Sequence, residues 1–313
     1  MKLAFLYAGQ GSQCAGMGED FYNTFPDFRG IWDQAASYLD FDLNQVCFQD
    51  PDGALHQTRY TQPCLLAFAA GVTHLLYQNG IRPQAAAGLS IGEYSALYAA
   101  GVLDLETVIK TVALRGRAME QAAQNLECGM TAVLGLEREQ LQQACDTASD
   151  AGVVEICNDN CPGQLVISGE RAAADRAGAL AKELGAKRCM PLNVSGPFHT
   201  SLMAPAGDAL ALHFAAISFG EPAFPVYFNC KGGLMDPGDT IPQLLVRQVQ
   251  SGVRWRETLS QMAADGIDTL LEIGPGKTLS GLAKKTIPGI TVYQIDKADQ
   301  LPSIVAALKG ESL

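Results

Sequence analysis

The chain has 313 residues, of which 33 are acidic and 22 are Lys or Arg, so its formal net charge is −11. Hydrophobic residues make up 48% and charged residues 18%, a balance that predicts a large packed core and excludes a disordered chain. The acidic character argues against nucleic-acid binding, which needs clustered Lys and Arg side chains.

Neither a membrane anchor nor a disulfide framework is expected. No run of about 18 uncharged apolar residues is present, and we interpret the start, MKLAFLYAGQGSQ, as a strand and loop rather than a signal peptide. The nine cysteines are scattered, and the one close pair, Cys157 and Cys161, has no second pair or His cluster beside it. We therefore expect a reduced, soluble, cytoplasmic protein without a metal site.

The first 127 residues alternate between apolar strands and amphipathic helices. In chain order, the patterns predict a strand at 2–8, a polar loop at 9–13, helices at 22–39 and 61–77, a strand at 85–89, and helices at 91–100 and 105–121. The second of these helices has Pro63 near its start, where a missing N–H is tolerated.

The order of predicted strands and helices changes between residues 129 and 193. Strands are predicted at 130–134, 153–157, 164–168 and 188–192, and helices at 138–148 and 172–184. This β-α-β-β-α-β order is the split ferredoxin-like pattern. It predicts a small inserted domain, residues 128–195, within a larger domain formed by residues 1–127 and 196–313.

The larger domain then resumes with further alternation. Helices are predicted at 202–216, 241–250, 255–265 and 278–285, and strands at 226–230, 269–273 and 291–295. Alternating strands and helices indicate an α/β fold with a parallel sheet covered on both faces.

Residues 88–92, GLSIG, match the G-x-S-x-G nucleophile elbow between an apolar strand and a helix. Small residues on both sides allow a sharp turn that projects the Ser90 hydroxyl away from the sheet. The same turn puts the N–H of Ile91 at a helix N-terminus, where it can stabilise an oxyanion. A Gly-rich turn without catalytic role is the alternative.

A serine nucleophile needs a base, and the chain offers four histidines. His74 lies in an apolar helix, His56 in a polar loop and His213 at a helix edge. His199 lies in a loop between a strand and a helix, where catalytic groups concentrate, and is the preferred candidate. No Asp is an evident third member, and a backbone carbonyl could orient the imidazole instead.

Several motifs together strongly resemble the malonyl-CoA:acyl-carrier-protein transacylases, which are related to polyketide acyltransferase domains. They are GQGSQ at 9–13, GLSIGEYSAL at 88–97, RGRAM at 115–119, NCPGQ at 160–164, GPFH at 196–199 and EIGPG at 272–276. The resemblance covers nearly the whole chain. It implies an α/β-hydrolase-like large domain with a parallel sheet and an inserted ferredoxin-like small domain.

The resemblance also implies roles for individual residues. Ser90 would be the nucleophile and His199 the base, held by the main-chain carbonyl of Gln248. The oxyanion hole would be formed by the N–H groups of Gln10 and Ile91. Substrate-binding roles would fall to Arg115, which would hold the malonyl carboxylate, to Asn160 near the entrance, and to Phe198 in malonyl selection.

Alternatives exist for some of these residues, and two positions depart from the family. A structural ion pair is the alternative for Arg115, because it follows an apolar run on a helix, and simple packing is the alternative for Phe198. Leu89 stands where the family commonly has His, which removes a polar neighbour of Ser90. Ala8 replaces the usual Pro, which predicts a less rigid loop.

The implied reaction is ping-pong transfer of malonyl from malonyl-CoA, through malonyl-Ser90, to the phosphopantetheine thiol of an acyl carrier protein in fatty acid synthesis. No cofactor is implied, and the chain is expected to be a monomer that binds neither nucleic acid nor membrane. Since carrier proteins are acidic, a basic patch is expected, with candidates Lys187, Arg188, Lys284 and Lys285. Alternatives are a loader of polyketide carrier proteins, an acyl-thioester hydrolase and a non-catalytic binding module.

Overall fold

The computed structural model describes residues 1–192 and 196–311. Internal contacts divide the chain into two compact units, each described here by itself. Unit 1 comprises Met1–Gly116, Ile217–Tyr227 and Met262–Leu313, and unit 2 comprises Arg117–Ala216 and Phe228–Gln261. These units differ in extent from the two predicted domains, whose boundaries stay a prediction. Ser195, the last residue of the predicted small domain, lies outside the described residues.

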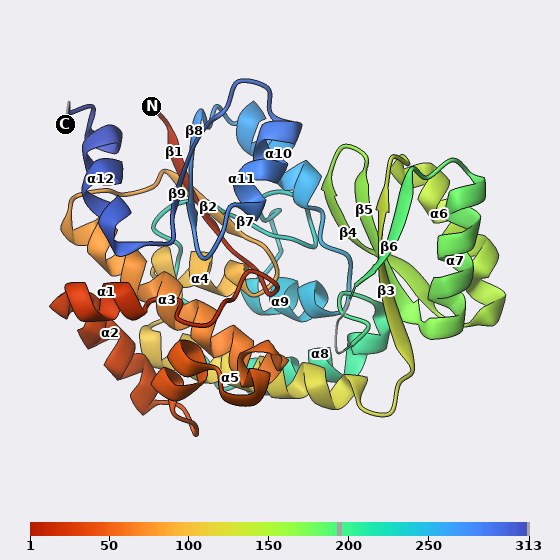
Figure 1. The fold of residues 1–313 in the computed structure, drawn as a ribbon, viewed down its shortest axis with the longest axis horizontal. Coiled ribbons are helices and arrows are strands. Elements are labelled where there is room, and N and C mark those ends of the chain that lie inside the picture. Colours follow the sequence, from red (N-terminus) through yellow and green to blue (C-terminus); the bar gives the residue numbers. More distant parts are fainter. Residues whose placement is uncertain (193–195, 312–313) are drawn as a thin grey trace. The chain divides into compact units, whose positions relative to one another are not determined.

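Unit 1 is built on a five-stranded parallel sheet with the strand order β7-β2-β1-β8-β9 (Figure 1). The strands are β1 (Leu3–Tyr7), β2 (Ala85–Gly88), β7 (Val226–Tyr227), β8 (Thr269–Ile273) and β9 (Thr291–Ile295). All five residues of central β1 are buried, as expected of a strand flanked on both sides and covered on both faces. The predicted parallel sheet is therefore confirmed.

The α-helices of unit 1 surround this sheet. They are α1 (Glu19–Thr24), α2 (Pro26–Ser37), α3 (Thr58–Gln78), α4 (Gly92–Ala99), α11 (Thr278–Thr286) and α12 (Leu301–Lys309), with the first part of α5 (Leu105–Ala123). Contacts join α4 to β1 and β2, and α11 and α12 to β9. None of the helices in the described residues combines the length and apolar character needed to cross a membrane.

Three differences from the predicted elements have physical reasons. The helix expected at 22–39 is broken into α1 and α2, because Phe25 is extended before Pro26 and a residue preceding proline avoids the helical region. The strand expected at 226–230 ends at Tyr227, since Phe228 turns back to pair with Gly233. Pro63 lies inside α3, which begins at Thr58 rather than at residue 61.

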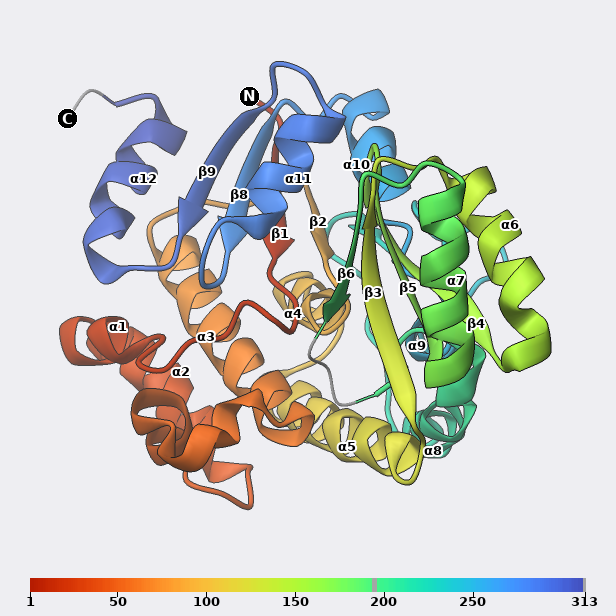
Figure 2. The ribbon, with the colours of Figure 1, turned by 45° about the vertical axis from the view of Figure 1, so that its right-hand side comes forward.

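Unit 2 contains a four-stranded antiparallel sheet with the order β4-β5-β3-β6. Its strands are β3 (Cys128–Leu134), β4 (Val154–Cys161), β5 (Gln164–Glu170) and β6 (Arg188–Leu192). Helices α6 (Arg138–Ala148) and α7 (Arg171–Glu183) pack side by side on one face (Figure 2). The predicted order of six elements is confirmed.

The core of this part of unit 2 lies between that sheet face and the two helices. It includes Val133, Leu141, Ile156, Ile167 and Ala177. The other helices of unit 2 are α8 (Ala204–Phe214), α9 (Ile241–Val249) and most of α10 (Trp255–Ala264), and α8 packs on α9.

Candidate active site

The chain makes a sharp turn between β2 and α4, and Ser90 stands at its apex. Ser90 has φ 55°, in the left-handed region that non-glycine residues rarely adopt. A Cβ at Gly88 would lie 1.9 Å from the Gly92 carbonyl carbon, and one at Gly92 would lie 2.3 Å from the Tyr7 oxygen. Both glycines of the motif are therefore required sterically. Ile91 is the N-cap residue of α4, so its N–H lies at the positive end of that helix.

The loop after β1 packs directly against this turn. A Cβ at Gly9 would lie 2.6 Å from the Leu89 carbonyl oxygen, so only glycine allows the two segments to approach this closely. Gln10 follows, and its Nε2 donates to Thr58 Oγ1 at 3.0 Å. The close approach brings the loop of Gln10 next to the turn of Ser90 and Ile91.

Arg115 lies on α5 and is fully buried. Its Nη2 donates a hydrogen bond to Ser90 Oγ at 3.2 Å, and its guanidinium carbon lies 5.4 Å from the centroid of the Tyr94 ring. Burial lowers the pKa of Arg115, while the Tyr94 ring and the buried Glu93 carboxylate oppose that shift. A buried cation next to the nucleophile can bind an anionic group on an acyl chain.

The residue after Arg115 explains how the helix comes so close. A Cβ at Gly116 would lie 2.8 Å from Arg59 Cα and 2.9 Å from the Thr58 oxygen. Glycine thus lets α5 contact the first turn of α3, whose Thr58 is the hydrogen-bond partner of Gln10. Gln10, Ser90, Ile91 and Arg115 consequently form one connected group in unit 1.

His199 lies in unit 2, where it is only 5% exposed. Its Nδ1 lies 2.9 Å from the backbone oxygen of Gln248, a buried residue of α9. Because a carbonyl oxygen only accepts hydrogen bonds, Nδ1 carries the proton and Nε2 of the neutral ring keeps its lone pair. The sequence suggested a main-chain acceptor in place of an Asp, and the structure contains this contact.

The loop that carries His199 is fixed by one local hydrogen bond and by bonds to a distant residue of β4. Thr200 Oγ1 donates to the Pro197 oxygen at 2.6 Å, and Ser201 donates to the Glu155 carboxylate from both its N–H and its hydroxyl. His199 itself has φ 59°. These contacts hold the imidazole in a backbone conformation that a free loop would rarely populate.

The other three histidines have different surroundings. His56 is exposed at the end of a 3-10 helix, rather than in an irregular loop, and its Nδ1 lies 3.3 Å from Gln13 Nε2. His213 lies near the end of α8, where burial lowers its pKa. His74 is half-buried on α3.

Phe198 and Asn160 both lie in unit 2 and are at least half-buried. Phe198 is 7% exposed, and a Cβ on Gly196 would come within 2.8 Å of its ring. Asn160 is half-buried near the end of β4. The preceding residue, Asp159, is buried beside Arg256, with 3.1 Å between Oδ2 and Nη2. Burial raises the pKa of Asp159, and the Arg256 charge lowers it.

The sequence reasoning assigned no role to four supporting residues, namely Thr58, Tyr94, Asp159 and Glu272, although Tyr94 and Glu272 lie within motifs that it quoted. Tyr94 could have been considered, because it lies in the first turn of the helix that follows Ser90. Glu272 could have been found as an acidic residue inside an apolar strand. Nothing in the local sequence signals Thr58, which contacts Gln10 from 48 positions away.

The EIGPG segment at 272–276 has a structural function beside the GQGSQ loop. The buried Glu272 carboxylate accepts hydrogen bonds from Leu279 N, Ser280 N and Ser280 Oγ at the start of α11. A Cβ at Gly274 would lie 2.4 Å from Ala8 Cβ. Ala8 N donates to the Ile273 oxygen at 3.1 Å, a bond that proline at this position would lack.

The cation candidates for a basic patch are exposed and fall in separate units. Lys187 and Arg188 belong to unit 2, and Lys284 and Lys285, at the end of α11, belong to unit 1. In residues 1–192 and 196–311, no group of three or more His, Cys, Asp or Glu side chains could hold a metal ion.

Residues 4–304 match the family model described as the acyl transferase domain. The chain is 39% identical over 312 residues to the malonyl CoA-acyl carrier protein transacylase of Bacillus subtilis (strain 168). The alignment covers 99% of this chain and 98% of that protein.

Two solved structures are similarly close. The malonyl CoA-acyl carrier protein transacylase from Clostridium perfringens ATCC 13124 matches with a TM-score of 0.95 and 37% identity, over 99% of this chain and 98% of that chain. A type II PKS acyl-carrier protein in complex with its malonyl-transacylase matches with a TM-score of 0.94 and 38% identity, over 99% of this chain and 100% of that chain.

Proposed function

The chain belongs to the acyl transferase family, among the malonyl CoA-acyl carrier protein transacylases, and from this premise we propose how its residues act. The enzyme transfers the malonyl group from malonyl-CoA to the phosphopantetheine thiol of an acyl carrier protein. The observation that carries the site assignment is the hydrogen bond between buried Arg115 and the Ser90 hydroxyl. That contact pairs a nucleophile with a cation suited to a free carboxylate.

In the first half-reaction, Ser90 Oγ attacks the thioester carbonyl and forms the tetrahedral intermediate. The hydroxyl proton passes to Nε2 of His199, which the Gln248 carbonyl keeps in the required tautomer. The N–H groups of Gln10 and Ile91 stabilise the oxyanion. Collapse breaks the carbon–sulfur bond, and the thiolate of coenzyme A takes the proton from His199.

In the second half-reaction, the carrier-protein thiol gives its proton to His199 and attacks the malonyl-Ser90 ester. Collapse of this intermediate releases Ser90, which recovers the proton from His199. Arg115 holds the malonyl carboxylate through both halves. By the same family resemblance, we assign Asn160 to the substrate entrance and the buried Phe198 side chain to the choice of malonyl.

The finer description of the fold follows from the same membership. We assign the parallel sheet with its helices to an α/β-hydrolase-like domain, and the β3–β6 sheet with α6 and α7 to an inserted ferredoxin-like domain. The sheet orders and the β-α-β-β-α-β connectivity support this assignment. No cofactor is proposed, and the monomeric state and the cytoplasmic location stay predictions.

A second candidate concerns only the carrier protein. One similar structure holds a type II PKS acyl-carrier protein with its malonyl-transacylase. The same residues and the same chemistry would then serve polyketide rather than fatty acid synthesis. Transfer rates to carrier proteins of the two kinds, measured side by side, distinguish the two roles.

Intact-mass spectrometry with malonyl-CoA tests the proposal. A malonyl adduct on Ser90, discharged by holo acyl carrier protein, is expected, and Ser90→Ala should abolish it. His199→Ala should slow both steps by at least about a hundredfold, whereas the matched control His213→Ala should not. Free malonate formed despite added carrier protein would identify a thioester hydrolase instead, and no adduct on Ser90 would refute the assignment.

A further inference from the structure

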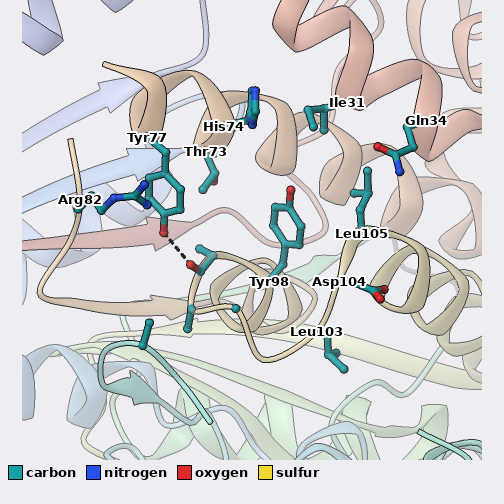
Figure 3. Close-up of a pocket in the computed structure, with 14 residues that line it drawn as sticks. Ile31, Gln34, Thr73, His74, Tyr77, Arg82, Tyr98, Leu103, Asp104 and Leu105 are labelled. Carbon is teal, nitrogen blue, oxygen red and sulfur yellow. Dashed lines mark hydrogen bonds between the residues drawn. The ribbon is translucent and has the colours of Figure 1, made fainter. Parts of the chain in front are cut away.

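Unit 1 contains a cavity of about 590 Å³ that none of the proposed roles uses (Figure 3). Its walls come from α2, α3 and the C-terminal end of α4, together with the loop that leads into α5. Ser90 precedes the first turn of α4, whereas Tyr98 and Ala99 of its last turn line the cavity. Eight helical residues span about 12 Å, so the cavity lies at the opposite end of α4 from the nucleophile.

A guanidinium group is held face-on at one side of this cavity. The Arg82 guanidinium carbon lies 4.0 Å from the centroid of the Tyr77 ring, and that ring is stacked with Phe5, with 6.5 Å between the ring centroids. Tyr77 is fixed in turn, because its hydroxyl donates to the Ala99 oxygen at 2.7 Å. In the part of the chain that the structure describes, no carboxylate pairs with Arg82. The guanidinium also interacts with the Tyr77 hydroxyl, and its remaining N–H groups can donate to an acceptor.

Two further polar side chains face the same space. Figure 3 shows the Tyr98 hydroxyl directed away from α4, toward the side where His74 and Ile31 lie. Both Tyr98 and His74 are half-buried, and among the described residues neither side chain has a hydrogen-bond partner in the protein. At half-buried positions their hydrogen bonds go to water or to a bound ligand. Both can donate a hydrogen bond, as Arg82 does, which favours an acceptor-rich ligand.

The one carboxylate at the cavity is already engaged. Asp104 accepts a hydrogen bond from Thr107 N at 2.7 Å at the start of α5, and this bond lowers the pKa of its carboxyl group. In Figure 3, Asp104 and Arg82 lie at opposite ends of the cavity. An anionic group is thus attracted to the Arg82 end. The remaining lining is mixed. It includes the apolar Ile31, Leu103 and Leu105, and the polar Gln34 and Thr73, whose side chains are hydrogen-bonded to Tyr38 and Tyr7.

We propose that this cavity is a second ligand site, which binds a small carboxylate with a planar apolar body. The carboxylate accepts hydrogen bonds from the Arg82 guanidinium and the Tyr98 hydroxyl. The planar body packs against the Tyr98 ring and covers Leu103 and Leu105. The site is separate from the acyl-transfer site, because it lies at the far end of α4.

Isothermal titration of the full chain with 2-naphthoate tests the proposal. One saturable site is expected, and Arg82→Ala should weaken binding by at least about tenfold, since it removes a charge-assisted contact. Tyr98→Phe should weaken it by about three- to tenfold. The matched control is Arg29→Ala, because Arg29 also stacks on a tyrosine, Tyr22, but does not line the cavity. This variant should bind within about twofold of the parent chain.

Related probes separate the parts of the recognition. Neutral 2-naphthylmethanol should bind at least about tenfold more weakly, since it has no charge for Arg82. Octanoate should also bind more weakly than 2-naphthoate, and equal affinity would overturn the requirement for a planar body. Arg82→Lys, which keeps the charge without the planar fork, should lie between the parent chain and Arg82→Ala.

Competition with malonyl-CoA supplies the decisive control. Saturating malonyl-CoA should leave 2-naphthoate binding unchanged, and competition would place the probe in the acyl-transfer site and overturn the proposal. Absence of saturable binding, or equal binding by the Arg82→Ala variant with an unchanged thermal melt, would overturn it as well. Because the assay requires no acyl transfer, its outcome is independent of the roles proposed for Ser90 and His199.

Discussion

Replacing Arg115 by Ala should change which acyl group the enzyme accepts. The guanidinium is fully buried and its Nη2 lies 3.2 Å from Ser90 Oγ. Burial lowers the pKa of Arg115, which means that the charged form is already disfavoured there. A malonyl carboxylate accepts hydrogen bonds from the guanidinium and adds a counter-charge to that of Glu93, whereas an acetyl group supplies neither.

The size of the effect follows from what is lost. Truncating one partner of a buried, hydrogen-bonded charge pair costs about 2–5 kcal/mol. At about 1.4 kcal/mol per factor of ten, kcat/KM for malonyl-CoA should fall between about thirtyfold and several thousandfold. Acetyl-CoA makes no such contact, so its kcat/KM should hold or rise. The malonyl-to-acetyl preference should consequently drop by at least about thirtyfold.

The assay is kcat/KM for loading holo acyl carrier protein from each thioester. Arg115→Lys keeps the charge but not the bidentate geometry and should fall between the parent and Arg115→Ala. Arg117→Ala, exposed two residues further along α5, is the matched control and should keep the preference. If both thioesters lose equally in Arg115→Ala, the guanidinium only supports the turn of Ser90, and the carboxylate role is refuted.

Three further changes test the supporting structure. Gly92→Ala places a Cβ 2.3 Å from the Tyr7 oxygen, so the free energy of unfolding, measured in urea, should fall by about 1–3 kcal/mol. Gly281→Ala on α11 is the control, because its Cβ would enter open space and should not destabilise the fold. Equal free energies of unfolding for the two variants would contradict the steric argument. The Ser90→Gly variant should be about 1 kcal/mol more stable than Ser90→Ala, because glycine adopts a φ of 55° without steric strain and alanine does not. Identical unfolding midpoints would mean that this turn is unstrained. Burial raises the pKa of Glu272, so the folded chain binds that proton more tightly than the unfolded chain. Its stabilising contribution is present below the unfolded value of about 4.3 and lost as pH rises through the raised folded value. Stability measured from pH 4.5 to 7 should therefore rise less, or fall more, with pH in the parent than in Glu272→Gln, and parallel curves would refute the shift.

Elements whose pattern is local could be predicted closely. The helix expected at 138–148 and the strands expected at 188–192, 269–273 and 291–295 have the same bounds in the structure. The helix at 138–148 and the strand at 269–273 have buried apolar residues along their length, whereas the strand at 188–192 is mostly exposed. The strand expected at 226–230 is shorter, because the turn from Phe228 to Gly233 depends on pairing rather than on composition. Helix α12 was not predicted, although Pro302 at its first turn is a common start signal.

The candidate site also has parts that the local sequence predicts and parts that it does not. Five consecutive residues predict the turn at Ser90, because only glycine fits at positions 88 and 92. The contact between His199 and the Gln248 oxygen joins residues 49 positions apart, and no periodicity encodes it. Neither does local sequence predict that Gly116 lets α5 meet α3. The pairing of His199 with Gln248 came from resemblance to a family, which supplies long-range pairings that single-sequence patterns lack, whereas the Gly116 contact was found only in the structure.

Backbone strain links the two residues proposed to carry the chemistry. In the described residues, five non-glycine positions have a left-handed φ, and three of them are Asp or Asn, whose short polar side chains tolerate it. The remaining two are Ser90 and His199. Such residues cost about 1–3 kcal/mol each and persist only where the surroundings fix them. At Ser90 the close contacts of the flanking glycines do so, and at His199 the bonds of Thr200 and Ser201 do. The chain therefore gives up stability at the two positions where the proposed mechanism requires a fixed direction for the hydroxyl and the imidazole, as expected where selection acts on activity rather than on folding alone.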